Sequence, residues 1–463
     1  MTNDINNKQF FFQNNSNIQT KSVRIAYKSY HEEWQKKVHI PGSKSFTNRA
    51  IVLAGMSAKP TILNGCLFAE DTFWGLQALI TLGFTIEIDE DKNSVRLTPP
   101  LHFTGSEFKI FLGKAGTLAR FFPAVILNWQ NTFSSFPEIK VYCDAHDQLK
   151  SRPLEPLISA LTMLNAKISD MRLPFMISSC HLMGSCEIGG EISGQFLSGL
   201  LLSACASQNS ICIKRINKLV QPNYINMTLS TIEAFGGNIN YDKDLNSFIV
   251  HPVRNLGVDT YSVEADASTC CYFIAAAFLH NFSLHIENIG HNTLQPDYKF
   301  IETLKILGAQ IISTETATTV YRRNNIQKIT GNFSFDLSNF SDQTLTLAVV
   351  ALFSDLPIEI YGIAHIRFHE CDRIACLVAN IKNLNLKIEE YHDRIIVYPI
   401  KNNFHEIKGE WKTWNDHRFV MAGFLIASMC ESVSILEPSC VEKTCPRFFE
   451  LVQQLGFQIS FNS

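Results

Sequence analysis

The stretch PGSKSFTNRAIVLAG (residues 41–55) joins a glycine turn to an apolar run of helical length. Five later stretches repeat this design, each with a small or polar residue that opens an apolar run after a short strand-like segment. The six openings follow one another by 72, 77, 74, 74 and 74 positions, and they are Ser45, Thr117, Gly194, Ser268, Asp342 and Asp416. Such regularity indicates a repeated supersecondary unit.

A second signature follows the same period, because each unit later ends a helix and turns into a strand. The first example is ALITLGFTIEI (residues 78–88). The residues at these turns suit a left-handed helix C-cap, and they are Gly83, Asn165, Gly236, Gly308, Asn385 and Gly456. Each unit therefore reads as strand, helix, strand, helix and one or two strands, which predicts an α/β protein. The helices after GSKS and ISGQ are apolar nearly all round, so we expect them to be buried between sheets.

The chain of 463 residues exceeds the size that one hydrophobic core usually supports. Six units divided as three and three would make two similar domains. A solenoid that binds other proteins is the alternative, but its repeats usually span only about 20 to 45 residues.

Composition excludes several classes of protein. The net charge of −3 and a pI near 6.5 provide no basic field for nucleic acid. The 13 cysteines are scattered without a Cys-x-x-Cys pair, which favours reduced thiols. Residues 1–20 are rich in Asn and Gln, so we expect a disordered extension without a signal peptide. No run of about 18 apolar residues occurs, which predicts a cytoplasmic protein without a membrane partner.

The first opening has the features of an anion site. Unpaired N–H groups at a helix N-terminus bind phosphate or carboxylate, and Lys44 adds a full charge there. Ser45 and Arg49, four residues apart, share one helix face. The segment is not a Walker P-loop, because Ser43 and Val38 occupy the positions where that motif has glycine. A simple capped helix is the alternative.

The second and third openings repeat this chemistry. Gly116 lets backbone approach a ligand, and Arg120 lies in the first helical turn after it. Gln195 provides an amide at the third opening. Between them, Arg152 precedes a proline in KSRP (residues 150–153). Solvated surface charge is the alternative for each arginine.

The fifth and sixth units contain acidic residues. Asp342 opens one helix and Asp416 the last, and Glu370 and Arg373 lie between them. An N-cap explains Asp342 alone, and a helix surface pair explains Glu370 with Arg373. A zinc site at His365 and His369 lacks the His-Glu-x-x-His spacing, so no metal is expected.

Ten short motifs, in order from about residue 38 to about residue 455, resemble the EPSP synthase family. They are PGSKSFTNR (41–49), LGKAGT (112–117), KSRP (150–153), SGQF (193–196), NYINMTL (223–229), EADAS (264–268), SDQTLTLA (341–348), HECDR (369–373), NDHR (415–418) and EKTCP (442–446).

The resemblance implies a two-domain inside-out α/β barrel of six βαβαββ repeats, with ligands in a cleft that closes between the domains. Residues 1–37 would hold an N-terminal extension and a first strand that packs in part with the C-terminal domain. Residues 38–260 would form the domain that binds shikimate 3-phosphate. Residues 261–463 would form the second domain, with the catalytic acids and the cations that bind phosphoenolpyruvate.

The implied activity transfers the enolpyruvyl group of phosphoenolpyruvate to the 5-hydroxyl of shikimate 3-phosphate, without a cofactor, in a monomer. By resemblance, Asp342 is the base for the hydroxyl, Glu370 handles the methylene proton, and Lys44 completes the catalytic set. The implied contacts of shikimate 3-phosphate are Lys44, Ser45, Arg49, Ser193, Gly194, Gln195, Asp342 and His369. The implied contacts of phosphoenolpyruvate are Lys44, Gly116, Arg120, Arg152, Gln195, Arg373, Arg418 and Lys443.

The chain departs from the family pattern at Lys114, Gly194, Gln221 and His369, where the family has asparagine, serine, serine and lysine. We hypothesise that His369 replaces the lysine as a cation and loses its charge between about pH 6.5 and 8.5. A related UDP-N-acetylglucosamine enolpyruvyl transferase is one alternative, although it normally has a cysteine before the Arg-Pro. A non-catalytic paralogue is the other.

Overall fold

The computed structural model describes residues 21–27, 35–103, 105–191, 193–323, 333–401 and 403–462. The expected disordered extension at residues 1–20 lies outside this part of the chain. The chain divides into two compact units. Unit 1 contains Gly42–Glu264, and unit 2 contains Ala265–Ser463 together with the described residues up to Pro41. The chain therefore passes from one unit to the other after Pro41 and again after Glu264.

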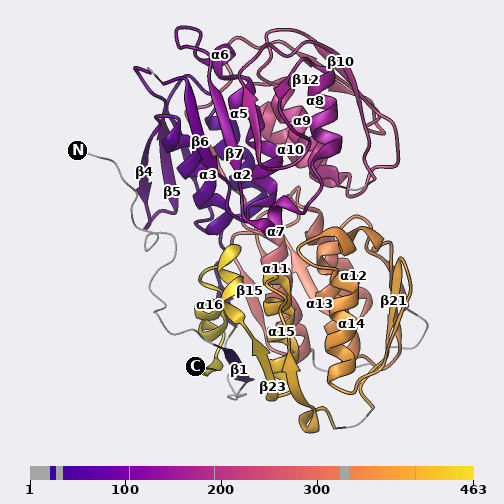
Figure 1. Cartoon of the computed structure of the whole chain (residues 1–463). Helices are drawn as coiled ribbons and strands as arrows, with labels where there is room; N and C mark the ends of the chain where they lie inside the picture. Colours follow the sequence, from indigo (N-terminus) through magenta and orange to yellow (C-terminus); the bar gives the residue numbers. More distant parts are fainter. Residues whose placement is uncertain are drawn as a thin grey trace. The chain divides into compact units, whose positions relative to one another are not determined.

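Six four-stranded sheets are present among the described residues, three in each unit, and all have one pattern (Figure 1). In each sheet the first two strands are parallel and the other two pairings are antiparallel. Unit 1 contains the sheets β14 (Thr260–Ser262), β3 (Thr61–Asn64), β5 (Ser94–Thr98), β4 (Thr85–Asp89); β6 (Glu107–Phe111), β7 (Lys140–Asp144), β9 (Phe175–Ser178), β8 (Lys167–Ile168); and β10 (Gly184–Ile188), β11 (Ile211–Arg215), β13 (Ser247–His251), β12 (Asn238–Tyr241).

Unit 2 builds its three sheets in the same way. They are β2 (Lys36–Val38), β15 (Leu284–Ile286), β17 (Thr318–Tyr321), β16 (Gln310–Ser313); β18 (Phe333–Asp336), β19 (Ile358–Tyr361), β21 (Arg394–Val397), β20 (Ile388–Glu390); and β22 (Lys408–Trp411), β23 (Ser432–Leu436), β1 (Ser22–Tyr27), β24 (Phe457–Asn462).

Three of these strands come from distant parts of the sequence. β14 lies at the end of the unit 1 stretch and pairs in parallel with β3 near its beginning. β2 pairs in parallel with β15, more than 240 residues later, with Lys36 opposite Leu284. β1 runs antiparallel to both β23 and β24. Each unit is therefore closed by strands that sequence order alone does not place together.

The interior of each unit is formed by helices that are almost fully buried, and the other helices expose one face. The helices of unit 1 are α2 (Lys44–Ala54), α3 (Glu70–Thr81), α4 (Gly116–Phe121), α5 (Pro123–Leu127), α6 (Trp129–Thr132), α7 (Asp147–Lys150), α8 (Glu155–Met163), α9 (Gly194–Ala204) and α10 (Asn223–Ala234). As expected from their apolar surfaces, α2 and α9 are buried along almost their whole length.

In unit 2 the same interior position belongs to α11, α13 and α15, which pack against one another and are almost entirely buried. The α-helices of this unit are α11 (Ala267–His280), α12 (Phe300–Ile306), α13 (Thr344–Leu352), α14 (Arg373–Asn383), α15 (His417–Met429) and α16 (Phe448–Gln454). Its short 3-10 helices are η1 (Pro296–Lys299), η2 (Ser341–Gln343), η3 (Ala364–Phe368), η4 (Phe404–Glu406) and η5 (Pro438–Lys443).

The predicted helix ends are confirmed, because all six residues have positive φ angles, from 58° at Asn385 to 92° at Gly308. Five of the six predicted openings lie within one residue of the start of an α-helix. Asp342 is the exception. It lies in η2, and α13 begins two residues later at Thr344 with Gln343 as its N-cap.

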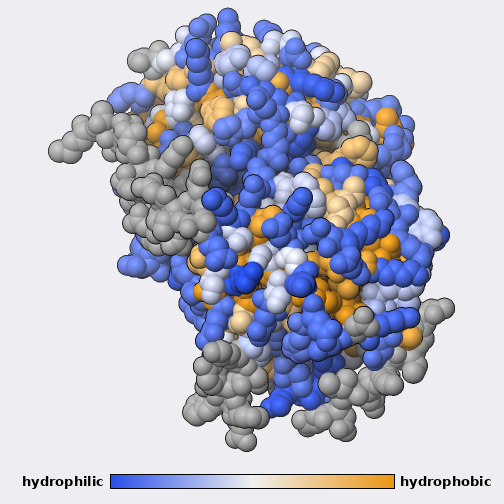
Figure 2. Space-filling view, turned by 60° about the horizontal axis from the view of Figure 1, so that its bottom comes forward, coloured by the Kyte–Doolittle hydropathy of each residue, from blue (hydrophilic) through white to orange (hydrophobic). Residues whose placement is uncertain are grey.

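The two connections between the units are each tied by a backbone hydrogen bond. In unit 1, Ser43 N donates to Glu264 O across 2.7 Å, and in unit 2, Asp266 N donates to Pro41 O across 2.8 Å. The surface in Figure 2 is mainly hydrophilic, with smaller apolar areas between the polar residues. Within the described ranges, no helix is long and apolar enough to cross a membrane.

Candidate functional site

Arg373 is the centre of a polar network in unit 2. It is the first residue of α14, after Asp372, whose side chain caps the helix by accepting from Ala375 N. The Arg373 side chain is only 2% exposed. Its guanidinium donates to three carboxylates, through Nη1 to Asp342 Oδ1 (2.8 Å), through Nη2 to Glu370 Oε2 (2.7 Å) and through Nε to Asp416 Oδ2 (2.7 Å).

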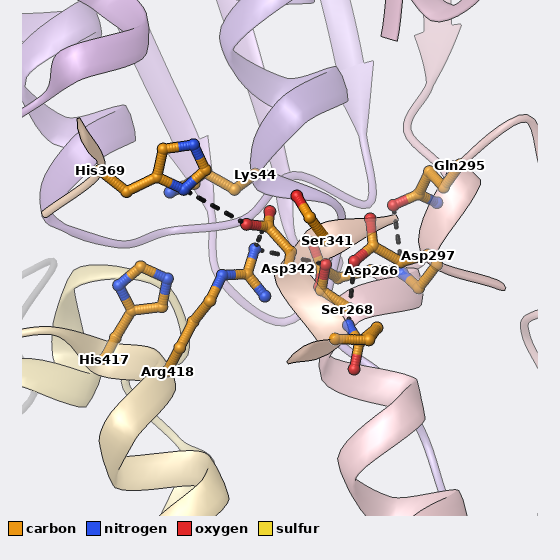
Figure 3. A network of polar contacts seen from close by, with 12 residues as sticks. Lys44, Asp266, Ser268, Gln295, Asp297, Ser341, Asp342, His369, His417 and Arg418 are labelled. Atoms are coloured by element: carbon orange, nitrogen blue, oxygen red, sulfur yellow. Dashed lines mark hydrogen bonds and ion pairs between the residues drawn. The ribbon is translucent and has the colours of Figure 1, made fainter. Parts of the chain in front are cut away.

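A second arginine, Arg418, also contacts Asp342. Arg418 Nη2 donates to Asp342 Oδ2 across 2.5 Å and lies 3.5 Å from the hydroxyl of Ser268. Figure 3 shows Arg418 and His369 pointing toward the Asp342 carboxylate from different elements. Burial raises the pKa of Asp342, but the positive charges of Arg418 and Arg373 outweigh burial and hold that pKa well below its usual value. The carboxylate is therefore ionised at neutral pH in the absence of ligand.

Glu370 is held between two cations. Its Oε2 accepts from Arg373, and its Oε1 lies 3.4 Å from Nζ of Lys443 at the end of η5. The Glu370 and Lys443 side chains are 11% and 7% exposed, so little water screens this pair. The interpretation of Glu370 and Arg373 as a surface pair is therefore wrong, and so is the interpretation of Asp342 as a helix cap.

His369 lies beside the same arginine, with its Nδ1 2.9 Å from Arg373 Nη1. Because guanidinium can only donate, Nδ1 is the acceptor and the ring proton resides on Nε2. Burial and the charge of Arg373 lower the pKa of His369 to about 3, against the opposing effects of Asp342 and Glu370. The hypothesis that His369 is a cation that titrates between pH 6.5 and 8.5 is therefore wrong for the ligand-free protein. The proximity of Arg373 to His369 could not be known from the sequence.

His365 has a different partner. Its Nε2 lies 2.7 Å from the hydroxyl of Ser341, the residue before Asp342. The rings of His365 and His369 are 5.9 Å apart and nearly perpendicular. Within the described part of the chain, no group of three or more His, Cys, Asp or Glu side chains could hold a metal ion.

Lys44 begins α2 in unit 1 and pairs with a buried carboxylate. Its Nζ lies 3.3 Å from Oδ2 of Asp71, whose side chain is 2% exposed. Asp71 is the second residue of α3. The sequence analysis missed Asp71, because nothing in the spacing of Lys44 and Asp71 indicates that α2 and α3 bring them together.

Arg49 is buried rather than solvated. It donates to Thr228 Oγ1 (2.9 Å), to Tyr224 O (3.1 Å) and to Ser45 O (2.9 Å), and its guanidinium lies 5.0 Å from the centre of the Phe121 ring. Burial lowers the pKa of Arg49 to about 10, so it remains charged at neutral pH. These hydrogen bonds fix the Arg49 side chain on the face of α2 that also bears Ser45.

Two cations of unit 1, Arg120 and Arg152, lie together beside Gly116. A Cβ atom on Gly116 would lie 2.5 Å from Arg152 Nη1 and 3.1 Å from Arg120 Nη1, so only glycine leaves room for both guanidinium groups. Arg120 donates to Gly116 O across 2.7 Å and to Pro153 O across 3.2 Å. These contacts fix Arg120 against the loop that bears Arg152.

The start of α9 presents polar groups as predicted. Ser193 is the N-cap, and its hydroxyl accepts from Gln195 N across 3.2 Å. Gly194 follows, buried in the first turn. The Oε1 atom of Gln195 is buried and accepts no hydrogen bond from the residues that the structure describes. A buried acceptor of this kind is available to a hydroxyl or ammonium group of a ligand.

The sequence analysis also did not identify Asp416 as a partner of Arg373. Asp416 is fully buried, caps α15 by accepting from Arg418 N (2.9 Å), and holds Arg373 through Nε. The motif NDHR (residues 415–418), which contains Asp416, was the sequence signal that could have indicated this role. Within unit 2 the structure thus unites two acids and three cations that the sequence analysis had singled out, and these are Asp342, Glu370, Arg373, Arg418 and Lys443.

Comparisons with known proteins show which family the chain resembles over nearly its whole length. A sequence profile of the EPSP synthase (3-phosphoshikimate 1-carboxyvinyltransferase) family matches residues 30–452. A 3-phosphoshikimate 1-carboxyvinyltransferase 2 of Halalkalibacterium halodurans is 33% identical over 439 residues, which cover 92% of each chain. A 3-phosphoshikimate 1-carboxyvinyltransferase of Buchnera aphidicola subsp. Cinara cedri is 31% identical over 423 residues, covering 90% of this chain and 94% of the relative.

A solved structure supports the fold. The EPSP synthase from Acinetobacter baumannii is similar with a TM-score of 0.75, covering 95% of this chain and 100% of that one. At 20% identity, this similarity concerns the fold alone. The predicted two-domain α/β fold is confirmed, and the solenoid alternative is wrong.

Proposed function

The chain belongs to the EPSP synthase (3-phosphoshikimate 1-carboxyvinyltransferase) family, and from this premise we infer that it transfers the enolpyruvyl group of phosphoenolpyruvate to the 5-hydroxyl of shikimate 3-phosphate. The products are EPSP and phosphate. The chain is thus a transferase of the shikimate pathway, which leads to the aromatic amino acids.

The observation that carries this function is the convergence of Arg373 and Arg418 on Asp342. The reaction joins two anionic substrates, so it requires cations whose positions are already set. It also requires a base for the attacking hydroxyl and an acid for the methylene carbon. The network of unit 2 contains both kinds of group within hydrogen-bonding distance of one arginine.

We assign the steps as follows. Asp342 accepts the proton of the 5-hydroxyl of shikimate 3-phosphate while the hydroxyl oxygen adds to C2 of phosphoenolpyruvate. Glu370 delivers a proton to the methylene carbon, which becomes a methyl group. In the second step, the C2–O bond to phosphate breaks and the leaving phosphate takes the proton that Asp342 accepted. Glu370 removes a proton from the methyl group, which restores the double bond.

The low pKa of Asp342 in the ligand-free protein makes it a weak base. Substrate binding would raise this pKa. Arg373 and Arg418 are the cations that lower this pKa. An anionic donor that accepts hydrogen bonds from the same arginines would compete with the Asp342 carboxylate for them. The pKa of Asp342 would then rise toward its usual value, and the carboxylate would become a better proton acceptor.

The remaining contacts are proposals that rest on the family resemblance and on local geometry. For shikimate 3-phosphate they include Lys44, Ser45, Arg49, Ser193, Gly194, Gln195 and His369. For phosphoenolpyruvate they include Lys44, Gly116, Arg120, Arg152, Gln195, Arg373, Arg418 and Lys443. With its proton on Nε2, His369 would serve shikimate 3-phosphate as a neutral donor and not as the cation that a lysine supplies.

The proposal includes a monomeric enzyme that works in the cytoplasm without a metal, a cofactor, nucleic acid or a membrane. The 13 cysteines, all free in the structure, are compatible with a reducing compartment.

Phosphate release from phosphoenolpyruvate tests the function directly. We expect release with shikimate 3-phosphate and none with UDP-N-acetylglucosamine as the acceptor. Release with the UDP sugar alone would show the related transferase instead. Release with neither acceptor, from protein with a native circular dichroism spectrum, would show a non-catalytic paralogue.

A further inference from the structure

Two cysteines lie beside the catalytic acid Glu370. Cys371 follows Glu370 directly, and Cys376 lies in the first turns of α14. Asp372 is the N-cap of this helix, so Cys371 occupies the position before the cap and Cys376 the fourth helical position. Side chains at these two positions meet across the start of a helix, in the arrangement known as the hydrophobic staple.

Each thiol shifts the pKa of the other, as expected for two side chains that meet in this way. Both residues are only partly buried, whereas most of the other cysteines are buried. Cys371 Sγ also lies 3.9 Å from Oδ2 of Asp416, the atom that accepts from Arg373 Nε. The pair therefore lies next to the network that holds both acids.

We propose that Cys371 and Cys376 form a reversible disulfide bond on oxidation, and that this bond switches the enzyme off. The oxidant we consider is hydrogen peroxide. The sulfur of Cys376 attacks one peroxide oxygen, which gives a sulfenic acid and water. The sulfur of Cys371 then attacks the sulfenic sulfur, its proton leaves with the hydroxide as a second water, and the disulfide forms.

Cys376 has the properties of the attacking thiol. The neighbouring thiol of Cys371 lowers the pKa of the Cys376 thiol, and this effect outweighs the opposing effects of burial, Asp372 and Asp416. Burial raises the pKa of buried thiols such as Cys66 and Cys205, which keeps them protonated and unreactive. The Cys376 thiol is therefore more readily oxidised than these buried thiols.

The effect on activity follows from which sulfur can move. A disulfide requires an S–S distance of about 2.05 Å, shorter than any hydrogen bond between thiols. Cys376 is fixed in α14, whereas Cys371 lies in the segment before it, so the bond draws Cys371 toward the helix. Glu370 is the adjacent residue, and its displacement breaks its contacts with Arg373 and Lys443. The loss of activity rests on the proposed function, but the formation of the bond does not.

Peptide mapping after peroxide treatment tests the bond itself. Trypsin cuts after Arg367, Arg373 and Lys382, so it separates the two cysteines into the peptides 368–373 and 374–382. We expect these peptides to be joined under non-reducing conditions and separated by dithiothreitol. Oxidised wild type without this joined pair would overturn the proposal.

Activity is measured on the same samples. We expect peroxide to lower kcat by about a hundredfold, the range for loss of one general acid, and dithiothreitol to restore it. Cys376→Ser keeps the basal rate and resists peroxide, while the matched control Cys212→Ser, at an exposed cysteine of β11, remains sensitive. A joined peptide pair with unchanged turnover would overturn the switch. If untreated protein were inactive, the proposed function would fail, yet the map would still decide whether the bond forms.

Discussion

Arg373 and Asp416 form a buried ion pair in which Nε of the arginine donates to Oδ2 of the aspartate across 2.7 Å, with side chains only 2% and 0% exposed. Asp416 thereby fixes the orientation of the guanidinium and leaves the two terminal nitrogens directed at Asp342 and Glu370. Either acid can be replaced by its amide while Arg373 keeps its buried anchor. Amide variants at these positions therefore report on chemistry more than on folding.

Asp342→Asn should lower kcat by at least about a hundredfold, because the amide keeps the shape but cannot accept the hydroxyl proton. Steady-state phosphate release at saturating substrates measures this. Asp355→Asn, at an exposed position of the same unit, is the matched control and should behave as wild type. An Asp342→Asn enzyme within about threefold of wild type would show that another group is the base.

Glu370→Gln should also lower kcat by at least about a hundredfold, since the methylene carbon loses its proton donor. Solvent isotope exchange gives a more specific measurement. In deuterium oxide, wild type should incorporate deuterium into the methylene group of phosphoenolpyruvate during turnover, and Glu370→Gln should not. Equal incorporation by both enzymes would remove Glu370 from this role.

His369 should contribute no titration to kcat/KM between pH 6.5 and 8.5. The folded pKa of about 3 lies below the ordinary value of 6.5, so the ring is neutral throughout this window and has no proton to lose. Because kcat/KM reports the free enzyme, His369→Asn should give a profile of the same shape as wild type, even if its values are lower. A fall above pH 6.5 that occurs in wild type and is absent from the variant would restore the role of His369 as a cation.

Gly116→Ala should raise the KM for phosphoenolpyruvate by about tenfold, a loss of about 1.4 kcal/mol of binding. The new methyl group would meet Arg152 Nη1 at 2.5 Å and would displace that guanidinium. Gly189→Ala is the matched control, because its nearest atom would be 3.8 Å away. Unchanged KM in both variants would mean that Arg152 does not contact this substrate.

The sequence predicted the features of the fold that depend on local chemistry. The six predicted helix-end residues, all with positive φ, are glycine or asparagine, which adopt the left-handed conformation at little cost, so their period could be read directly. Strand exchange could not be predicted in the same way. The pairing of β2 with β15 joins segments more than 240 residues apart, and the sequence of a short strand does not indicate which strand it pairs with.

The residues of the site could also be predicted where they lie in local motifs, but their partners in space could not. The residue types of Asp342, Glu370 and Arg373 and their order in the motifs were sufficient to single them out. The partners Asp71 and Asp416 depend on how helix starts meet in space, which no local pattern records. The pKa of His369 depends on burial and on one arginine nitrogen 2.9 Å away, so its direction could be stated only from the structure.

The placement of β1 and β2 has a consequence for how the protein is made. Among the described residues, unit 1 is the single stretch Gly42–Glu264, whose ends are joined by the hydrogen bond between Ser43 and Glu264, so this stretch can fold as soon as it has left the ribosome. Unit 2 has no such freedom. Its strand β1 is synthesised long before its partners β23 and β24, because Arg24 of β1 and Ser434 of β23 are 410 residues apart. During translation, β1 therefore cannot pair with these strands until the chain has been synthesised as far as β24, and unit 2 is completed only after all of unit 1 has been made.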